Sequence, residues 1–452
     1  MKKFLLFLTL TFPLLSIELR WDWNKINTEE VSFPKNFIWG VSTSSHQVEG
    51  NCYNNWTLWE KYKKYEPSGT ACDHYNRCHE DIALLKQLGV DSYRFSVEWS
   101  RIEPQQGVFN EVEIKHYRDY CIALKNAGIK VMLTMHHFTN PVWFENKGAF
   151  EKEENIQHFV NFCTKVFEEL HDVVDFWITI NEPAIYMFQG YVRTVFPPGK
   201  TNLPKASQVL WHLMLAHCRV YKAIKQLPAG QDAKIGIAHN ILQFEAFREN
   251  NLLDKVISKN YRNIVSDCVV EFFKTGKFNF KFGSELSPTQ LPYFANFEIY
   301  YPDAPECLDF FGLNYYSNVL LNVLKGSEDY REGDIRTDMP YAIYAEGFYR
   351  AIKQVSEVGK PIYITENGIP DAKDDRRATW IKRYTYAMSQ AIAEGYDVRG
   401  FFYWSLMDNY EWDFGYYQKF GLFEVDFKSQ ERKLRQGSLA FVDIIKKYKE
   451  LN

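Results

Sequence analysis

The sequence lacks a strong excess of either charge. Its 452 residues include 53 Lys and Arg against 57 Asp and Glu, which gives a formal net charge of -4 and a pI near 6.3. A domain that binds nucleic acid usually has a basic patch and a high pI, so this balance predicts no nucleic-acid partner. Hydrophobic residues make up 46% and charged residues 24%, values ordinary for a globular protein with a full core.

The sequence also lacks a hydrophobic run of the length that a membrane helix needs, which is about 20 residues. Met1-Lys2-Lys3 is followed by a short apolar run, Phe4 to Leu15. A basic start before a short apolar segment is typical of a secretory signal peptide. We therefore predict a signal peptide over residues 1–18, and export to the periplasm or the cell exterior with no membrane domain after its removal. No small-x-small cleavage pattern follows Leu15, so an uncleaved anchor and a cytoplasmic protein with a buried first segment stay as alternatives.

No tight cysteine framework is present. A chain of this size uses most cysteines as small core residues, although export would allow Cys72 to pair with Cys78 or Cys52. There is no Cys-x-x-Cys pair to argue for zinc, and His136-His137 has no carboxylate or third histidine at ligand spacing. No Gly-x-Gly-x-x-Gly follows the first predicted strand, which argues against a dinucleotide. We predict neither a metal nor another cofactor. The eight cysteines are Cys52, Cys72, Cys78, Cys121, Cys163, Cys218, Cys268 and Cys307.

Aromatic residues, by contrast, are abundant. They make up 17% of the chain, with 12 Trp and 29 Tyr. Such a content fits a large core, and it equally fits a cleft lined with rings on which sugar faces stack. Composition alone leaves both interpretations open.

Strand-like and helical segments alternate along the chain. Short β-branched and aromatic runs begin near residues 37, 92, 130, 176, 234, 309, 361 and 398. Helical sequence separates them, for example at 111–126 and 378–394. Eight such units in this length predict a parallel α/β fold, a single (β/α)8 TIM barrel over residues 33–450, because neither an internal repeat nor a linker divides it. We expect the polar segment Ser44 to Gly50 to be an exposed loop.

Two of the predicted strands end in a glutamate. Phe176-Trp-Ile-Thr-Ile-Asn-Glu-Pro183 is an apolar run that ends in Asn181 and Glu182, and Pro361-Ile-Tyr-Ile-Thr-Glu-Asn-Gly368 delivers Glu366 in the same way. The C-terminal ends of barrel strands form the active-site face, so the two glutamates predict a two-carboxylate site. Other polar or aromatic side chains fall at the same ends, namely Gln47, Arg94, His137, Asn240, Asn314, Tyr316 and Trp404.

With these residues collected, the sequence resembles glycoside hydrolase family 1, of the β-glucosidase type, from about residue 33 to 448. The motifs that carry the resemblance are Phe37-Ile-Trp-Gly with Gln47-Val-Glu-Gly, Cys72-Asp-His-Tyr, Tyr93-Arg-Phe-Ser, Thr179-Ile-Asn-Glu-Pro, Asn314-Tyr-Tyr, Ile364-Thr-Glu-Asn-Gly, Trp404-Ser-Leu-Met-Asp-Asn-Tyr-Glu-Trp and Phe420-Gly-Leu. Each motif is short, and their joint order and spacing make the resemblance specific.

The resemblance implies retaining hydrolysis of a small-molecule β-glycoside or oligosaccharide. Glu366 is then the nucleophile and Glu182 the acid/base, with Arg94 and Tyr316 holding the nucleophile charged and oriented. Trp404 is expected to stack on the sugar, and Phe420 to border the pocket. The substrate-binding residues that the resemblance implies are Gln47, His137, Asn181, Asn314, Trp404, Glu411, Trp412 and Phe420.

The chain departs from the family pattern in a few places. Asn140 stands where the family usually has Leu, which predicts a different pocket rim, and Phe138 replaces a frequent Trp. The charged loop 326–339 is expected to help set the aglycone side. Glu411 would repel a phosphate, which argues against a 6-phospho-β-glycosidase. The expected activity is exo-acting β-glucosidase, with β-galactosidase or β-fucosidase as side activities. A transglycosidase and a carbohydrate-binding pseudoenzyme are the alternatives.

Overall fold

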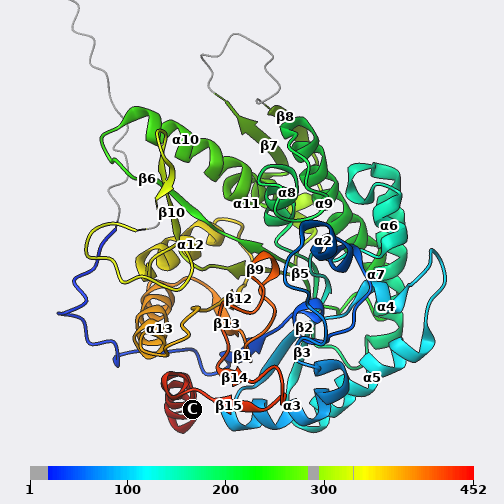
Figure 1. The fold of residues 1–452 in the computed structure, drawn as a ribbon, viewed down its shortest axis with the longest axis horizontal. Helices are drawn as coiled ribbons and strands as arrows, with labels where there is room; N and C mark the ends of the chain where they lie inside the picture. Colours follow the sequence, from blue (N-terminus) through cyan, green and yellow to red (C-terminus); the bar gives the residue numbers. More distant parts are fainter. Residues whose placement is uncertain (1–18, 284–294, 329, 452) are drawn as a thin grey trace, which may run out of the picture.

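Eight parallel strands form a closed barrel at the centre of the molecule, in the order β1-β13-β12-β9-β5-β4-β3-β2 (Figure 1). The computed structural model describes residues 19–283, 295–328 and 330–451. The predicted (β/α)8 barrel is confirmed, and each strand begins within a residue or two of its predicted start. The barrel strands are β1 (Ile38–Ser42), β2 (Ser92–Ser96), β3 (Lys130–His136), β4 (Phe176–Asn181), β5 (Ile235–Asn240), β9 (Phe310–Asn314), β12 (Ile362–Asn367) and β13 (Val398–Trp404).

The register of the strands aligns their C-terminal ends. Ser42 at the end of β1 pairs with Trp404 on one side and with Arg94 on the other. On β12, which neighbours β13, Glu366 pairs with Asn314 of β9 after a register shift. The polar residues that the sequence places at strand ends are therefore brought to one face of the barrel.

Helices form a layer around the strands (Figure 1). The long ones are α3 (His74–Leu88), α5 (Glu111–Asn126), α7 (Ile156–Leu170), α9 (Leu203–Lys225), α12 (Ala345–Ser356), α13 (Arg377–Ala393) and α14 (Leu439–Leu451). Local sequence explains their ends. Asn110 caps α5 by accepting a hydrogen bond from the N–H of Val112, and Gly89 ends α3 in a left-handed conformation with φ of +71°.

One predicted helix is divided in the structure. Residues near 255–275 form α10 (Leu252–Arg262), a π-helical turn at Asn263–Asp267, and α11 (Cys268–Thr275). Hydrophobic spacing alone does not reveal a π turn, because it is a single turn within an otherwise helical segment. No helix in the described part of the chain is both long and apolar enough to cross a membrane. The predicted signal peptide, residues 1–18, lies outside the described residues.

The barrel interior is filled by alternating large and small residues. Its cluster includes Phe176, Phe310 and Phe402. Glycines make room for these rings: a Cβ at Gly40 would lie 2.4 Å from Phe402 Cδ1, and one at Gly236 would lie 2.5 Å from Phe310 Cε2. The barrel is thus packed at its centre, and an open site can form only toward its ends.

The prediction that Ser44 to Gly50 form an exposed loop was wrong. The segment contains a one-turn helix, α1 (Ser45–Val48), and its side chains are buried. Tertiary partners satisfy its polar groups: His46 Nε2 lies 2.9 Å from Glu60 Oε1, and Ser45 Oγ donates to Glu98 Oε2 at 3.2 Å. Sequence reasoning missed this because the partners are distant in the chain or lie on other elements.

Additional elements cover the C-terminal end of the barrel. They include α8 (Pro183–Tyr191), α10, and a small sheet of β6 (Gln243–Ala246), β10 (Asn318–Asn322) and β11 (Gly326–Glu328). The shorter helices are α2 (Asn55–Lys63), α4 (Trp99–Ile102) and α6 (Val142–Asn146), and the remaining strands are β7 (Lys277–Phe282), β8 (Ala295–Tyr300), β14 (Phe423–Val425) and β15 (Arg432–Leu434). All eight cysteines lie in described residues and all are free, so Cys72 is paired with neither Cys78 nor Cys52.

Candidate active site

A cavity of about 670 Å³ opens at the C-terminal ends of the strands, and both Glu182 and Glu366 line it. The structure also brings other residues predicted for the site into the lining of this cavity: His137, Asn181, Tyr316, Trp404, Glu411, Trp412 and Phe420. Arg94, Gln47 and Asn314 are fully buried and stand behind the lining, where each contacts a residue that faces the cavity.

Glu366 is held at the end of β12 by two donors. Arg94 Nη1 lies 2.7 Å from its Oε1, and the Tyr316 hydroxyl donates to its Oε2 at 2.7 Å. Each carboxylate oxygen therefore has its own charged or hydroxyl partner, which fixes the orientation of the group.

Arg94 itself is held by hydrogen bonds to groups on β3, β4 and β12. Its Nη1 donates to the Thr365 carbonyl at 2.9 Å, its Nη2 to Asn181 Oδ1 at 2.7 Å, and its Nε to Thr134 Oγ1 at 3.2 Å. A guanidinium offers five N–H donors in a planar fork, which suits this many acceptors. The sequence interpretation missed the two threonines as partners of Arg94, because a buried Thr in a β-strand ordinarily signals only strand propensity.

Glu182 follows directly after β4 and is placed by backbone conformation. Its φ of +47° turns the chain sharply into α8, with Pro183 at the start of that helix. A positive φ is uncommon in a residue other than glycine, and such residues are concentrated at functional sites. Asn314 Nδ2 donates to Glu182 Oε1 at 2.8 Å. Because Thr365 Oγ1 lies 2.6 Å from Asn314 Oδ1, the amide of Asn314 presents its NH2 group to the glutamate.

The two carboxyls have different electrostatic surroundings. Burial, and then the neighbouring charge of Glu366, raise the pKa of Glu182 to about 8. Burial also raises the pKa of Glu366, but the Arg94 guanidinium and the Tyr316 hydroxyl oppose that rise. Glu366 therefore loses its proton first, and Glu182 stays protonated at neutral pH.

A hydrogen-bonded row joins Arg94 to His137 through Asn181. Asn181 accepts from Arg94 and places its Nδ2 3.2 Å from His137 Nε2. Burial, and then the Arg94 charge, lower the pKa of His137 well below its usual value, so the ring is neutral. A neutral imidazole beside the cavity can donate or accept a hydrogen bond without adding charge.

Glu411, Trp404 and Trp412 line the cavity, and Gln47 supports Glu411 from behind. Gln47 Nε2 donates to Glu411 Oε2 at 3.1 Å and to the Tyr410 carbonyl at 2.8 Å. Burial and the charge of Glu366 raise the pKa of Glu411 to about 8. The rings of Trp404 and Trp412 stack near the His137 ring, with centroids 5.8 Å and 6.1 Å away. Phe420 packs edge-on against Tyr316, with centroids 5.8 Å apart.

The interpretation of Asn140 as a rim residue was wrong, whereas Phe138 does line the cavity. Asn140 is fully buried, and its Oδ1 lies 2.9 Å from His136 Nε2. Its Nδ2 donates to Glu145 Oε2 at 2.9 Å. A side chain satisfied in this way supports the wall from behind. In the loop 326–339, Gly326, Ser327 and Met339 reach the cavity.

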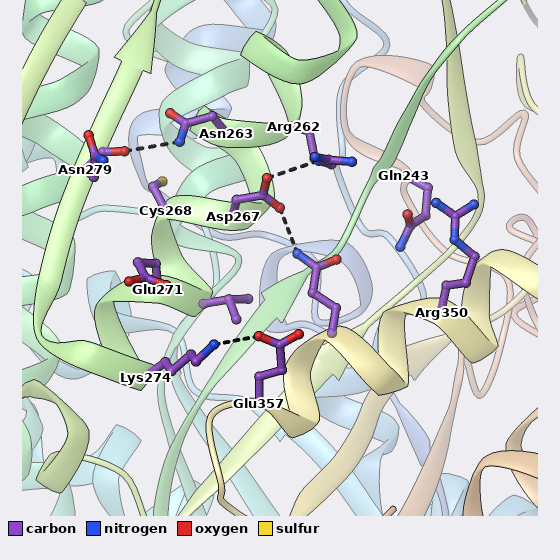
Figure 2. Close-up of a pocket in the computed structure, with 12 residues that line it drawn as sticks. Gln243, Arg262, Asn263, Asp267, Cys268, Glu271, Lys274, Asn279, Arg350 and Glu357 are labelled. Atoms are coloured by element: carbon purple, nitrogen blue, oxygen red, sulfur yellow. Dashed lines mark hydrogen bonds and ion pairs between the residues drawn. The ribbon is translucent and has the colours of Figure 1, made fainter. Parts of the chain in front are cut away.

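A second cavity, of about 430 Å³, lies between α11 and α12 and is lined by charged groups (Figure 2). Its charges pair with each other: Arg262 Nε lies 3.0 Å from Asp267 Oδ2, and Lys274 Nζ lies 2.7 Å from Glu357 Oε2. Neither Glu182 nor Glu366 lines it. Among the described residues, no cluster of three or more His, Cys, Asp or Glu has the arrangement of a metal site.

Comparisons with known proteins identify relatives across nearly the whole chain. The family model of glycosyl hydrolase family 1 matches residues 29–450. β-Glucosidase A of Thermotoga maritima is 31% identical over 453 residues, which cover 92% of this chain and 98% of that protein. Among solved structures, a β-glycosidase from Pyrococcus horikoshii is 34% identical with a TM-score of 0.81, over 92% of this chain and 96% of its own. A family 1 β-glucosidase from Thermotoga maritima is 30% identical with a TM-score of 0.82, over 92% and 98%.

Proposed function

Because the chain belongs to glycosyl hydrolase family 1, we propose that it is a retaining exo-β-glucosidase that hydrolyses terminal, non-reducing β-D-glucosyl residues. One observation carries the proposal. Glu182 and Glu366 line the same cavity; burial and the Glu366 charge raise the pKa of Glu182 to about 8, whereas Arg94 and Tyr316 oppose the rise that burial causes in the pKa of Glu366. A retaining glycosidase needs this combination of an acid and a nucleophile.

In the first step, the carboxylate of Glu366 attacks the anomeric carbon, and the glycosidic C–O bond breaks. Glu182 donates its proton to the departing oxygen, so the aglycone leaves as an alcohol. Arg94 and Tyr316 keep the nucleophile ionised and aimed, because each donates to one of its oxygens at 2.7 Å. The product of this step is a glycosyl ester on Glu366.

In the second step, water replaces the aglycone. Ester formation removes the negative charge of Glu366, one of the two main causes that raise the pKa of Glu182. Glu182, now a carboxylate with a lower pKa, takes a proton from the water as it attacks the anomeric carbon. Two inversions at that carbon give net retention of the β configuration.

The sugar is held by rings and neutral polar groups. Trp404 and Trp412 provide faces on which the pyranose stacks, and Glu411, His137 and Asn181 are placed to bond its hydroxyls. Glu411 disfavours a sugar phosphorylated at O6, since its carboxyl supplies no positive charge to pair with the phosphate and repels it once ionised. A galactosyl or fucosyl residue differs from glucose at few positions, so both remain side activities.

Initial rates of the purified protein on nitrophenyl glycosides test the proposal. The β-glucoside should release nitrophenol fastest, with slower release from the β-galactoside and β-fucoside. The α-glucoside and the 6-phospho-β-glucoside should give no release above background. Folded protein that is silent on every β-glycoside would instead support a binding protein without activity.

The alternatives are not favoured by what is observed. A binding pseudoenzyme has no need for both carboxylates, and the relatives bear the names β-glucosidase and β-glycosidase rather than that of a transglycosidase.

We also propose that residues 1–18 direct export. N-terminal sequencing of the mature protein from cell fractions tests this: a full-length chain in the cytoplasm would contradict it.

A further inference from the structure

The cavity changes character with distance from the two carboxyls. Around Glu182 and Glu366 its lining is polar and aromatic, as described above. In the part of the cavity formed by α8, β6, α10 and β10, most of the lining residues are aliphatic or aromatic. From this change we propose that the aglycone site is built for a hydrophobic alcohol, and that the natural substrate is an amphiphilic β-glucoside with a hydrocarbon aglycone rather than a cello-oligosaccharide. The proposal rests on the proposed glucosidase activity and adds a substrate class to it.

Three rings from three elements form the first part of this outer wall. Phe188 of α8, Phe244 of β6 and Tyr261 of α10 line the cavity together. Phe244 and Tyr261 stack with centroids 5.6 Å apart, and Phe188 meets the Tyr261 ring edge-on at 5.7 Å. Such a cluster is rigid and already packed, so it offers a preformed apolar surface to a ligand.

Aliphatic side chains continue the wall. Leu242, Ile257, Val319 and Leu321 line the cavity next to the ring cluster, from the segment before β6, from α10 and from β10. A sugar bound here would leave its hydroxyls facing hydrocarbon, and an unpaired buried polar group is costly. An alkyl chain in the same place would be removed from water with no such cost.

Polar residues also reach the outer lining, among them Arg193 and Asp413. Burial raises the pKa of Asp413, and a backbone hydrogen bond and the Arg193 charge oppose that rise. Gln189 contributes a buried Oε1 that has no hydrogen-bond partner among the described residues, which is where an aglycone hydroxyl could bind.

The wall continues onto exposed apolar surface outside the cavity. Leu252 and Leu253 at the start of α10 are 73% and 60% exposed, and Leu324 in the turn after β10 is 79% exposed. The two segments are joined, because Asp254 Oδ1 accepts a hydrogen bond from the N–H of Val323 at 2.9 Å. Figure 1 shows α10, β6 and β10 grouped at one edge of the molecule. These exposed leucines extend the apolar surface of α10 and β10 beyond the cavity lining.

A series of alkyl β-glucosides tests the inference. Methyl, butyl, hexyl and octyl β-glucoside, each below the concentration at which it forms micelles, are compared with cellobiose, cellotriose and nitrophenyl β-glucoside. Alkanols from butanol to octanol have nearly the same acidity, so differences in kcat/KM report aglycone binding. We expect kcat/KM to rise about two- to fourfold for each added methylene that is buried, and the octyl glucoside to exceed cellobiose by at least about tenfold.

Variants locate the effect in the outer wall. Leu242→Asn and Val319→Thr keep approximate side-chain size and add polarity, and each should lower the ratio of octyl to methyl glucoside kcat/KM by about fivefold or more. Val112→Thr is the matched control, because Val112 is 73% exposed on α5, away from the cavity lining, and this variant should leave the ratio unchanged. Inhibition of the wild-type enzyme by methyl and octyl β-thioglucoside provides a readout that needs no variant: the octyl compound should bind at least about tenfold more tightly.

The possible outcomes separate this inference from the proposed function. Turnover of nitrophenyl β-glucoside with a flat alkyl series, equal binding of the two thioglucosides, or cellobiose faster than octyl glucoside would overturn the hydrocarbon aglycone and leave the glucosidase intact. No turnover of any β-glucoside by folded protein would overturn both.

Discussion

Arg94 Nη1 lies 2.7 Å from Glu366 Oε1, and the two side chains are 0% and 4% exposed. A buried ion pair of this kind is costly to form, but it is still more costly to break, because removing one partner leaves an uncompensated charge. In the proposed mechanism this pair serves the chemistry, because the carboxylate must be ionised and stationary in order to attack. Thr134, Thr365 and Asn181, which hold the guanidinium, thereby contribute to the position of the nucleophile.

Removing Arg94 should therefore change the free energy of unfolding, the value of kcat/KM and the pH dependence of catalysis together. In Arg94→Gln we expect the free energy of unfolding to fall by about 3–5 kcal/mol near neutral pH, and kcat/KM to fall on the order of 100-fold as the nucleophile loses its position. Loss of the positive charge raises the pKa of Glu366, so the acidic limb of the pH profile moves to higher pH. Denaturant unfolding and pH-dependent kinetics measure these effects.

Arg118→Gln is the matched control for that variant. Arg118 pairs with Asp172 at the surface, where both side chains are partly exposed, and such pairs contribute about 0–1 kcal/mol. An acidic limb that is the same in Arg94→Gln as in the wild type would contradict the role assigned to Arg94.

Removing the nucleophile should abolish turnover without unfolding the protein. In Glu366→Gly we expect kcat to fall by at least about 10³-fold, while the vacated space admits a small anion. Added azide or formate should then restore part of the activity, with a product of inverted configuration because only one displacement occurs. The rescue is followed by NMR of the product. Wild-type activity in this variant would show that another group attacks.

Removing the acid should discriminate between leaving groups. In Glu182→Ala, substrates whose alcohol leaves readily as an anion need little protonation, so their first step should slow far less than that of alkyl glucosides. Single-turnover rates on dinitrophenyl and methyl β-glucoside measure the difference. Equal losses on both substrates would count against a role for Glu182 as acid.

The pH profile of kcat/KM should be bell-shaped. Glu366 must be ionised, so activity falls at low pH as it is protonated. Glu182 must be protonated, and burial with the Glu366 charge raises its pKa to about 8, so activity falls again above about pH 8. The pKa of Glu411 is raised to a similar value, so a variant of each glutamate is needed to identify which one causes the alkaline limb. The alkaline limb on an activated substrate should vanish in Glu182→Ala and persist in Glu411→Gln.

Much of the fold could be predicted because the strand signals are local. Runs such as Ile362-Tyr-Ile and Trp177-Ile-Thr-Ile are apolar and β-branched, and each is followed by a turn or by proline. The long helices were likewise marked by their spacing and by terminal glycines such as Gly89 and Gly128. Helix starts are less clearly marked in the sequence: α3 begins at His74, and the preceding Asp73 makes no side-chain cap hydrogen bond.

The parts that were missed depend on contacts between distant segments. Gln47 and His46 lie in a segment that reads as an exposed loop, and only partners such as Glu411 and Glu60 explain its burial. Asn140 was misplaced for the same reason, since its Nδ2 also donates to the hydroxyl of Tyr186 on α8, 46 residues away in the chain. The apolar outer wall could not be recognised in the sequence either, because it combines residues from α8, α10, β10 and the β6 region.

The most direct test of the account is the anomeric configuration of the sugar at the moment of its release. NMR spectra are recorded during the first minutes of hydrolysis of nitrophenyl β-glucoside by a high concentration of enzyme, before mutarotation. The two-step mechanism through Glu366 and Glu182 predicts that β-glucose appears first and then equilibrates with the α anomer. Initial release of α-glucose would mean a single displacement by water and would contradict the role of Glu366 as nucleophile.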